Sequence, residues 1–218
     1  MKLEDALESL PVIAILRGVR PSEAVAIGRA LLGAGVRAIE VPLNSPAACE
    51  SIARLAGDVG DRAIIGAGTV LAPDDVRATA DAGARFVVAP DTNADVIAAV
   101  LERGLEPVPG IATPSEAFAA RRAGARWLKL FPANALGMDF WRALRAVLPT
   151  DMRVAAVGGI DATNAGAWLD AGVAALGTGS SVYRPGLSAA EAGTGAKALV
   201  GAVRATPLAA GIAAPTAG

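Results

Sequence analysis

The stretch AGARWLKLFP, from Ala123 to Pro132, places a glycine shortly before an apolar run of the kind found in β-strands. A glycine followed by an apolar run recurs along the 218 residues, in AGVRAIEV from Ala34, AGARFVVAP from Ala82, RGLEPVPG from Arg103 and AGVAALGTGS from Ala171. Each run is typical of a helix that ends at a glycine and is followed by a buried parallel strand. Three further apolar runs bring the number of expected strands to eight: VIAIL from Val12, RAIIGAG from Arg62 and RVAAVGG from Arg153.

Eight strands, each followed by a helix, predict an α/β fold with a single (βα)8 TIM barrel over residues 1–204 and a short N-terminal helix. Capping boxes at Thr113 and Ser188 mark the beginnings of two of the helices. An open doubly wound sheet shares the alternation of strands and helices, but the regular spacing and the number of strands favour the barrel. Residues 205–218 are small residues and prolines, from which we expect a disordered tail.

The composition excludes several classes of function. The chain has no histidine and one cysteine, Cys49, so we expect no disulfide, no metal site and no metal cofactor. A net charge of -1 and 4% aromatic residues do not suit nucleic-acid binding, and no apolar run is long enough to span a membrane. The N-terminus does not resemble a secretory signal. We therefore expect a cytoplasmic protein whose partners are small molecules and which needs no cofactor.

Lys129 is one of three lysines in a chain that otherwise uses arginine, and it lies within an apolar strand. Side-chain alternation puts Lys129 on the same face as Trp127 and Phe131, which we expect to be the inside of the barrel. A buried amine loses hydration, so its pKa falls and it can attack a carbonyl as a Schiff-base nucleophile. The alternative is a lysine whose ammonium group reaches water at the end of the strand.

Glu40 raises the same question in AIEVPL, because a buried carboxylate needs a partner such as Lys129 or Arg17. Glu40 could belong to a structural ion pair, or it could transfer protons at a substrate hydroxyl, directly or through a water. In a chain without histidine, it is the best candidate for a general acid/base.

Glycines at the ends of the last two strands predict a phosphate site. In TIM barrels, backbone N–H groups at this place often bind phosphate. The candidate phosphate ligands are Gly158, Gly159, Gly179 and Ser180, with Arg17 as the cation. The run GAGT, residues 66–69, is either a simple turn or a carboxylate site that includes Thr69.

Several motifs in combination resemble those of the class I aldolases of 2-keto-3-deoxy-6-phospho sugar acids. The similarity extends from about Leu10 to Arg204. The motifs are IAILRG (13–18), EVPLNSP (40–46), IGAGTV (65–70), PGIATPSEA (109–117), LKLFPA (128–133) and AVGGI (156–160). The resemblance implies a homotrimeric carbon–carbon lyase in which Lys129 forms the Schiff base and Glu40 is the general acid/base. It further implies that Thr69 contacts the pyruvyl carboxylate, that Phe131 lines the pocket, and that the glycine loops hold phosphate.

Within that family the chain resembles the galactonate branch more than the gluconate branch. Asn44 stands where the gluconate branch has an arginine, and Val157 stands where it has a threonine. A threonine hydroxyl can bind a substrate hydroxyl of one configuration and a valine cannot, so Val157 is a candidate for setting preference at C4. Cleavage of the gluconate epimer, cleavage of both epimers, and a non-catalytic barrel that binds a phosphorylated ligand are the alternatives.

Overall fold

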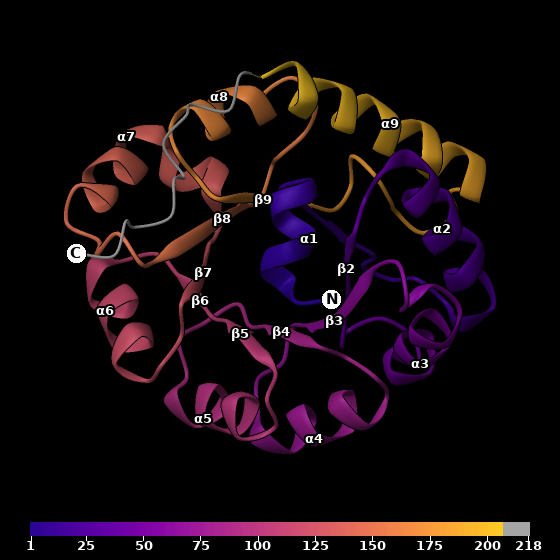
Figure 1. The fold of residues 1–218 in the computed structure, drawn as a ribbon, viewed down its shortest axis with the longest axis horizontal. Helices are drawn as coiled ribbons and strands as arrows, with labels where there is room; N and C mark the ends of the chain where they lie inside the picture. The colour runs from indigo at the N-terminus through magenta and orange to yellow at the C-terminus, as the bar shows by residue number, and fades with distance from the viewer. Residues whose placement is uncertain (207–218) are drawn as a thin grey trace.

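The protein, seen in a computed structural model that describes residues 1–206, is an α/β barrel whose strands are surrounded by helices (Figure 1). The strands are β1 (Val12–Ile15), β2 (Ala38–Pro42), β3 (Ile64–Gly68), β4 (Phe86–Val88), β5 (Glu106–Val108), β6 (Gly110–Ile111), β7 (Trp127–Leu130), β8 (Arg153–Val157) and β9 (Ala175–Thr178). The helices are α1 (Leu3–Ser9), α2 (Pro21–Ala34), α3 (Ala48–Val59), α4 (Pro73–Asp81), α5 (Ala94–Glu102), α6 (Pro114–Arg122), α7 (Ala133–Arg145), α8 (Ala165–Asp170) and α9 (Ala189–Ala205). Of the expected tail, Ala205 ends α9, and residues 207–218 lie outside the described residues.

The turns between helices and strands follow from glycines in the left-handed backbone region. Gly35 ends α2 with φ 107°, and the amide of Val36 donates to the carbonyl of Leu31 at 3.1 Å. This is the 6→1 bond of a Schellman motif, which reverses the chain into the following strand. At the start of α9 the predicted capping box is present, and at α6 Thr113 caps the amide of Glu116. In a capping box the carboxylate of Glu116 would accept from the amide of Thr113, but here it accepts from the amide of the preceding residue, Ala112.

The strand order β5-β4-β3-β2-β1-β9-β8-β7-β6 closes the barrel through one segment of the chain. Residues 106–111 were expected to form one strand and instead form two, β5 and β6, on either side of Pro109. Proline has no amide hydrogen to donate, so the ladder breaks there. The first half pairs with β4 and the second half pairs with β7, where the amide of Lys129 donates to the carbonyl of Pro109 at 2.8 Å. The eight expected strands are therefore nine pieces of one parallel barrel.

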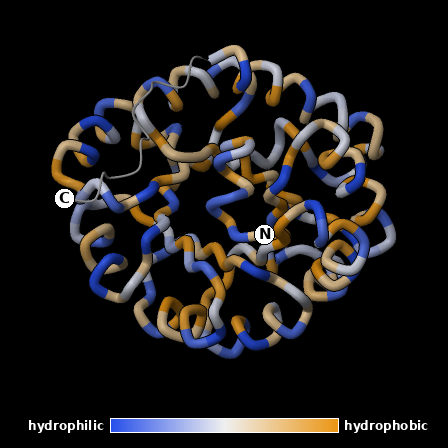
Figure 2. Tube along the Cα trace, viewed as in Figure 1, coloured by the Kyte–Doolittle hydropathy of each residue, from blue (hydrophilic) through white to orange (hydrophobic). Residues whose placement is uncertain are grey.

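Side-chain alternation divides the strands into an inner and an outer face. Outward residues such as Leu128, Leu130 and Ile39 pack against the helices in one apolar cluster. Inward residues form a second, smaller cluster inside the barrel: Ile13, Ile15, Ala38, Ile64, Phe86, Val88, Val108, Trp127, Ala155, Val157 and Ala175. In Figure 2, hydrophobic positions recur along the central strands, whereas many hydrophilic ones lie on the outer helices.

Helix α1 fills one end of the barrel. Its Leu3, Ala6 and Leu7 belong to the inner cluster, and Figure 1 shows α1 inside the ring of strands. Two residues, Leu10 and Pro11, connect it to β1, and its Glu4 pairs with Arg153, the first residue of β8. The N-terminal ends of the strands are therefore covered, which leaves the C-terminal ends for a site. Within residues 1–206, none of the helices has the length and apolarity to cross a membrane.

Candidate active site

Two buried ionisable side chains, those of Glu40 and Lys129, face each other across the barrel. Glu40 is 2% exposed and Lys129 is 3% exposed, and each is the third residue of its strand. Their strands, β2 and β7, lie on opposite sides of the ring. Between them are β1, β9 and β8 in one direction, and β3, β4 and the β5–β6 segment in the other. Trp127 belongs to the inner cluster, and Phe131 packs against it with its ring centroid 4.6 Å from Lys129 Nζ. The predicted inward direction of Lys129 is confirmed.

Small residues make room around both groups. Lys129 is in register with Gly110 on one side and Ala155 on the other, so neither neighbour has a large side chain. Glu40 is in register with Gly66, and its carboxylate lies over Gly68, two residues further along β3. A methyl group on Gly68 would overlap with Glu40 Oε1 and would lie 2.9 Å from its Cγ. The glycine is therefore needed for this position of the carboxylate.

Burial shifts both groups toward their neutral forms. Loss of hydration raises the pKa of Glu40, and the positive charges of Lys129 and Arg17 reduce this rise. Loss of hydration likewise lowers the pKa of Lys129. The negative charge of Glu40 raises this pKa, and the positive charge of Arg17 lowers it further. None of the ion pairs within residues 1–206 includes Glu40 or Lys129. The structural ion pair considered for Glu40 is thus not formed, and Glu40 Oε1 has no hydrogen-bond partner among the described residues.

Arg17 follows β1 and its guanidinium is held by a residue after β2. Arg17 Nη1 donates to Asn44 Oδ1 at 2.6 Å. The neighbouring Ser45, which is buried, accepts from the amide of Gly18 at 2.8 Å. The two loops are therefore tied together at the C-terminal end of the barrel. Asn44 and Ser45 were not among the predicted site residues, because no local pattern reports a contact between positions 27 residues apart.

Thr69 follows β3 with a φ of 57°, in the left-handed backbone region. This conformation is a true outlier for a β-branched residue and persists only where the surroundings impose it. Such strain concentrates at functional sites. Thr69 is half-buried and lies one residue after Gly68, the last residue of β3.

Four of the five predicted phosphate residues follow two neighbouring strands, β8 and β9, and the fifth, Arg17, follows β1. Val157 and Gly177 are in register, and a Val157 methyl fills the space over Gly177 inside the barrel. Gly158 and Gly159 follow Val157 with φ values of 107° and 70°, which an L side chain rarely adopts. After β9, Gly179 and the exposed Ser180 border open space, because a methyl group on Gly179 would meet, among the described residues, only the Ile15 carbonyl at 4.0 Å.

Tyr183 belongs to the framework of the site. Its side chain is 2% exposed, and its hydroxyl donates to Glu23 Oε1 on α2 at 2.7 Å. Burial and the adjacent carboxylate raise the pKa of this phenol. The following Arg184 is exposed. Within residues 1–206, no group of three histidine, cysteine, aspartate or glutamate side chains is arranged to hold a metal ion.

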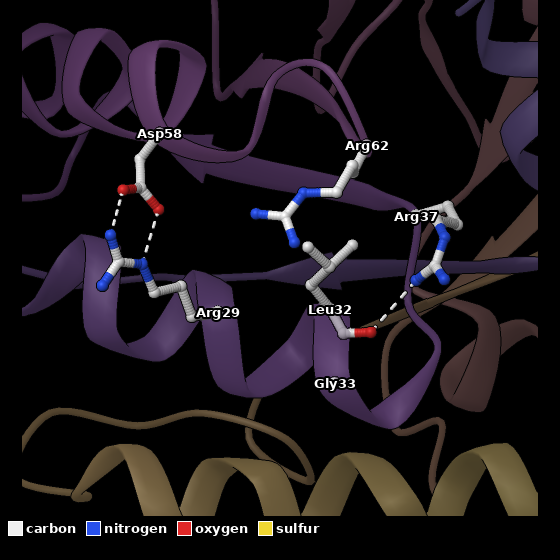
Figure 3. A pocket seen from close by; sticks show the side chains of 6 residues that line it. All are labelled: Arg29, Leu32, Gly33, Arg37, Asp58 and Arg62. Atoms are coloured by element: carbon white, nitrogen blue, oxygen red, sulfur yellow. Dashed lines mark hydrogen bonds and ion pairs between the residues drawn. The ribbon is translucent and has the colours of Figure 1, made fainter.

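A surface hollow of about 720 Å³ lies elsewhere, between α2 and α3 on the outer layer. Figure 3 shows that Arg29 faces Asp58, with which it forms two hydrogen bonds, and that Arg37 donates to the carbonyl of Leu32. No predicted site residue lines this hollow. The candidate site is therefore the open end of the barrel.

Comparisons with known proteins agree with this geometry. The family model "KDPG and KHG aldolase" matches residues 3–193. The 2-dehydro-3-deoxy-6-phosphogalactonate aldolase of Escherichia coli K12 is 47% identical over 195 residues, 89% of this chain and 95% of that protein. A solved structure described as native KDPGal matches with a TM-score of 0.88 at 47% identity, over 89% of this chain and 95% of that one.

A more distant solved structure is the KDPG aldolase of Legionella pneumophila, with pyruvate captured as a covalent carbinolamine intermediate. Its TM-score is 0.80 at 26% identity, over 94% of this chain and 98% of that one. The family match covers far more than half of the sequence. The chain therefore belongs to the KDPG and KHG aldolase family, whose members are carbon–carbon lyases.

Proposed function

We propose that this aldolase cleaves 2-dehydro-3-deoxy-6-phosphogalactonate to pyruvate and D-glyceraldehyde 3-phosphate through a Schiff base on Lys129. The observation that carries the proposal is a buried amine, shifted toward its neutral form, that faces a buried carboxylate across the barrel. The captured carbinolamine of the Legionella relative supports the same chemistry with pyruvate.

In the proposed reaction, the neutral amine of Lys129 attacks the C2 ketone to give a carbinolamine, which takes up one proton from solvent and loses water to leave a protonated imine; the proton is released again on hydrolysis. The electron pair of the C3–C4 bond then moves into the imine and forms an enamine. Glu40 takes the proton of the C4 hydroxyl, directly or through a water, so that glyceraldehyde 3-phosphate leaves as an aldehyde. Glu40 returns a proton to C3 of the enamine, and water hydrolyses the resulting imine to pyruvate and free Lys129.

The remaining site residues bind the two ends of the substrate. Thr69 contacts the pyruvyl carboxylate, and Phe131 lines the pocket beside the imine. The phosphate is bound by the loops that contain Gly158, Gly159, Gly179 and Ser180, together with Arg17. The glycine loops follow β8, which pairs with β7, and β9, the next strand along, so a substrate held at Lys129 through C2 can extend toward these loops with its terminal phosphate.

Preference for the galactonate epimer is proposed from Val157 and from the comparisons. Val157 lies inward beside Gly158 and brings a methyl group where a hydroxyl would bind one C4 configuration. Identity is 47% to the galactonate relative of Escherichia coli and 36% to the 2-dehydro-3-deoxy-phosphogluconate aldolase of Treponema pallidum.

The test is pyruvate release from the two C4-epimeric 2-keto-3-deoxy-6-phospho acids, side by side, with Lys129→Ala as the blank. Faster cleavage of the galactonate compound supports the proposal. Faster cleavage of the gluconate compound keeps the aldolase and overturns the proposed preference. If neither is cleaved above the blank, the chain is a barrel that binds a phosphorylated ligand without catalysis.

A homotrimer and a cytoplasmic location remain proposals that the family resemblance supports. Light scattering of the purified protein tests the homotrimer, because the measured mass must equal that of three chains of 21.7 kDa. A mass of one or two chains would refute the trimer.

A further inference from the structure

Two hydroxyl groups join the loops that follow β8 and β9. Thr178 Oγ1 donates to the carbonyl of Ile160 at 3.1 Å, and Ser181 Oγ is 3.0 Å from the same carbonyl oxygen. The two hydroxyl oxygens also contact each other. The two hydroxyl oxygens and the Ile160 carbonyl oxygen therefore form a triangle of three contacts. The two hydroxyl groups can donate in only two of these contacts at a time, because each has one hydrogen.

Thr178 is not in a position to touch a substrate inside the barrel. It is 1% exposed and is the last residue of β9, on the same face as Leu176, which packs against the helices. A buried hydroxyl requires a hydrogen-bond partner, and here that partner is the loop after β8. The role of the hydroxyl therefore lies in the arrangement of the loops.

The first three residues of the loop after β8, Gly158 to Ile160, each have a carbonyl group that accepts a hydrogen bond. The carbonyl of Gly158 accepts from the amide of Asn134 at 3.2 Å, and that of Gly159 accepts from Asn164 Nδ2 at 2.7 Å. The carbonyl of Ile160 accepts from the hydroxyl pair. Because the N–H and C=O groups of a trans peptide point in opposite directions, the N–H groups of Gly159 and Ile160 point away from these partners. This orientation leaves them free to bind an anion.

The loop after β9 is fixed from its other side as well. The amides of Val182 and Tyr183 donate to the carbonyl of Gly179, and the Tyr183 hydroxyl bonds to α2. Pro185 packs so closely on Gly18 that a methyl group there would lie 2.7 Å from its Cγ. The three loops that contain the proposed phosphate ligands are thus connected to one another by hydrogen bonds and packing.

We propose that Thr178 and Ser181 are positioning residues for the phosphate subsite, which set the spacing of the two glycine loops through their shared bond to the Ile160 carbonyl. The inference rests on the proposed function, because it assigns the phosphate to these loops. It adds that loss of the hydroxyl pair weakens recognition of the phosphate and leaves the chemistry at Lys129 intact.

The experiment compares Thr178→Val, which removes the hydroxyl at nearly constant volume, with Thr178→Ser, which keeps it. Each variant is assayed with the phosphorylated 2-keto-3-deoxy acid that the wild type cleaves best and with the same acid without its phosphate. Borohydride trapping of pyruvate on Lys129 measures the imine separately. For Thr178→Val we expect KM for the phosphorylated acid to rise about fivefold to tenfold, as for one lost hydrogen bond. The rate with the unphosphorylated acid and the trapping of pyruvate remain at wild-type values, and Thr178→Ser restores KM.

Equal loss of activity with both acids would overturn the inference, because it would mean a general structural role. An unchanged KM for the phosphorylated acid would overturn it as well. Ser181→Ala, at a half-buried position, is the second variant and decides the question if Thr178→Val does not fold. If the wild type cleaves neither phosphorylated epimer, the proposed function fails and the inference fails with it. Cleavage by the wild type together with an unaltered Thr178→Val refutes the inference alone.

Discussion

Gly68 makes possible the position of the Glu40 carboxylate, and Gly68→Ala tests this relation directly. The added methyl group would overlap with Glu40 Oε1 and would lie 2.9 Å from its Cγ. Ordinary contacts between carbon atoms are about 3.5–4.0 Å, so the Glu40 side chain has to move by about 1 Å. Glu40 is buried, and any new position must be found inside the packed barrel.

The expected loss of activity follows from that displacement. A misplacement of about 1 Å in a reacting group lowers the rate by about 10²-fold. We therefore expect kcat for cleavage to fall by about 10²-fold in Gly68→Ala. Overpacking of the interior lowers the free energy of unfolding by about 1–3 kcal/mol, which leaves the protein folded at 25 °C. Trapping of pyruvate on Lys129 remains, because Lys129 lies on the opposite side of the barrel.

The assay is single-substrate kinetics together with borohydride trapping and thermal unfolding, on Gly68→Ala and on a control. The control is Gly201→Ala in α9, where an added methyl group meets no atom of residues 1–206 within 4 Å. This variant keeps wild-type kcat and gains up to about 1 kcal/mol in unfolding free energy, because alanine favours the helix. Wild-type kcat in Gly68→Ala would refute the reasoning, since it would mean that cleavage does not depend on the observed position of Glu40.

Three further predictions concern pH and stability. The cleavage rate falls as the pH decreases through the raised pKa of Glu40, because the carboxylate base becomes protonated. Protonation of Lys129 below its own lowered pKa reduces the rate further. A rate that stays constant down to pH 4.5, the ordinary pKa of the carboxyl group, would contradict this prediction. In Lys129→Met the free energy of unfolding at pH 7 rises by about 0.5–2 kcal/mol, because burial lowers the pKa of Lys129 below its ordinary 10.5 and so makes the protonated lysine unfavourable in the folded state. The control is the exposed Lys197→Met, whose free energy of unfolding stays at the wild-type value. A lower free energy of unfolding in Lys129→Met would contradict this prediction. Chemical denaturation of Ser188→Ala shows a loss of about 1 kcal/mol at the start of α9, whereas the mid-helix Thr194→Ala shows none; equal effects would argue against the cap.

Most of the fold could be predicted because its determinants are local. A glycine at the end of a helix and an apolar run after it are read from adjacent residues, and Gly35 and Gly124 both adopt the left-handed conformation. The division of the fifth strand at Pro109 was missed, although proline cannot donate to a ladder. The open sheet considered as the alternative is excluded by the pairing of residues 106–111 with strands on both sides.

The candidate site could be predicted where side-chain alternation decides the direction of a residue. Lys129 and Glu40 are inward for that reason, and the same alternation could have placed Gly68 beside Glu40. The partners Asn44 and Ser181 could not be found in this way. Their bonds to Arg17 and to the Ile160 carbonyl join residues 27 and 21 positions apart, and only the closed barrel brings them together.

The most direct test of the account is to reduce the protein with borohydride in the presence of pyruvate and to locate the adduct by mass spectrometry of its peptides. The account predicts one pyruvyl adduct on Lys129, none on the exposed Lys197, and no adduct in Lys129→Ala. An adduct on another residue, or cleavage of the phosphorylated acid by Lys129→Ala, would contradict the assignment of Lys129 as the Schiff-base lysine.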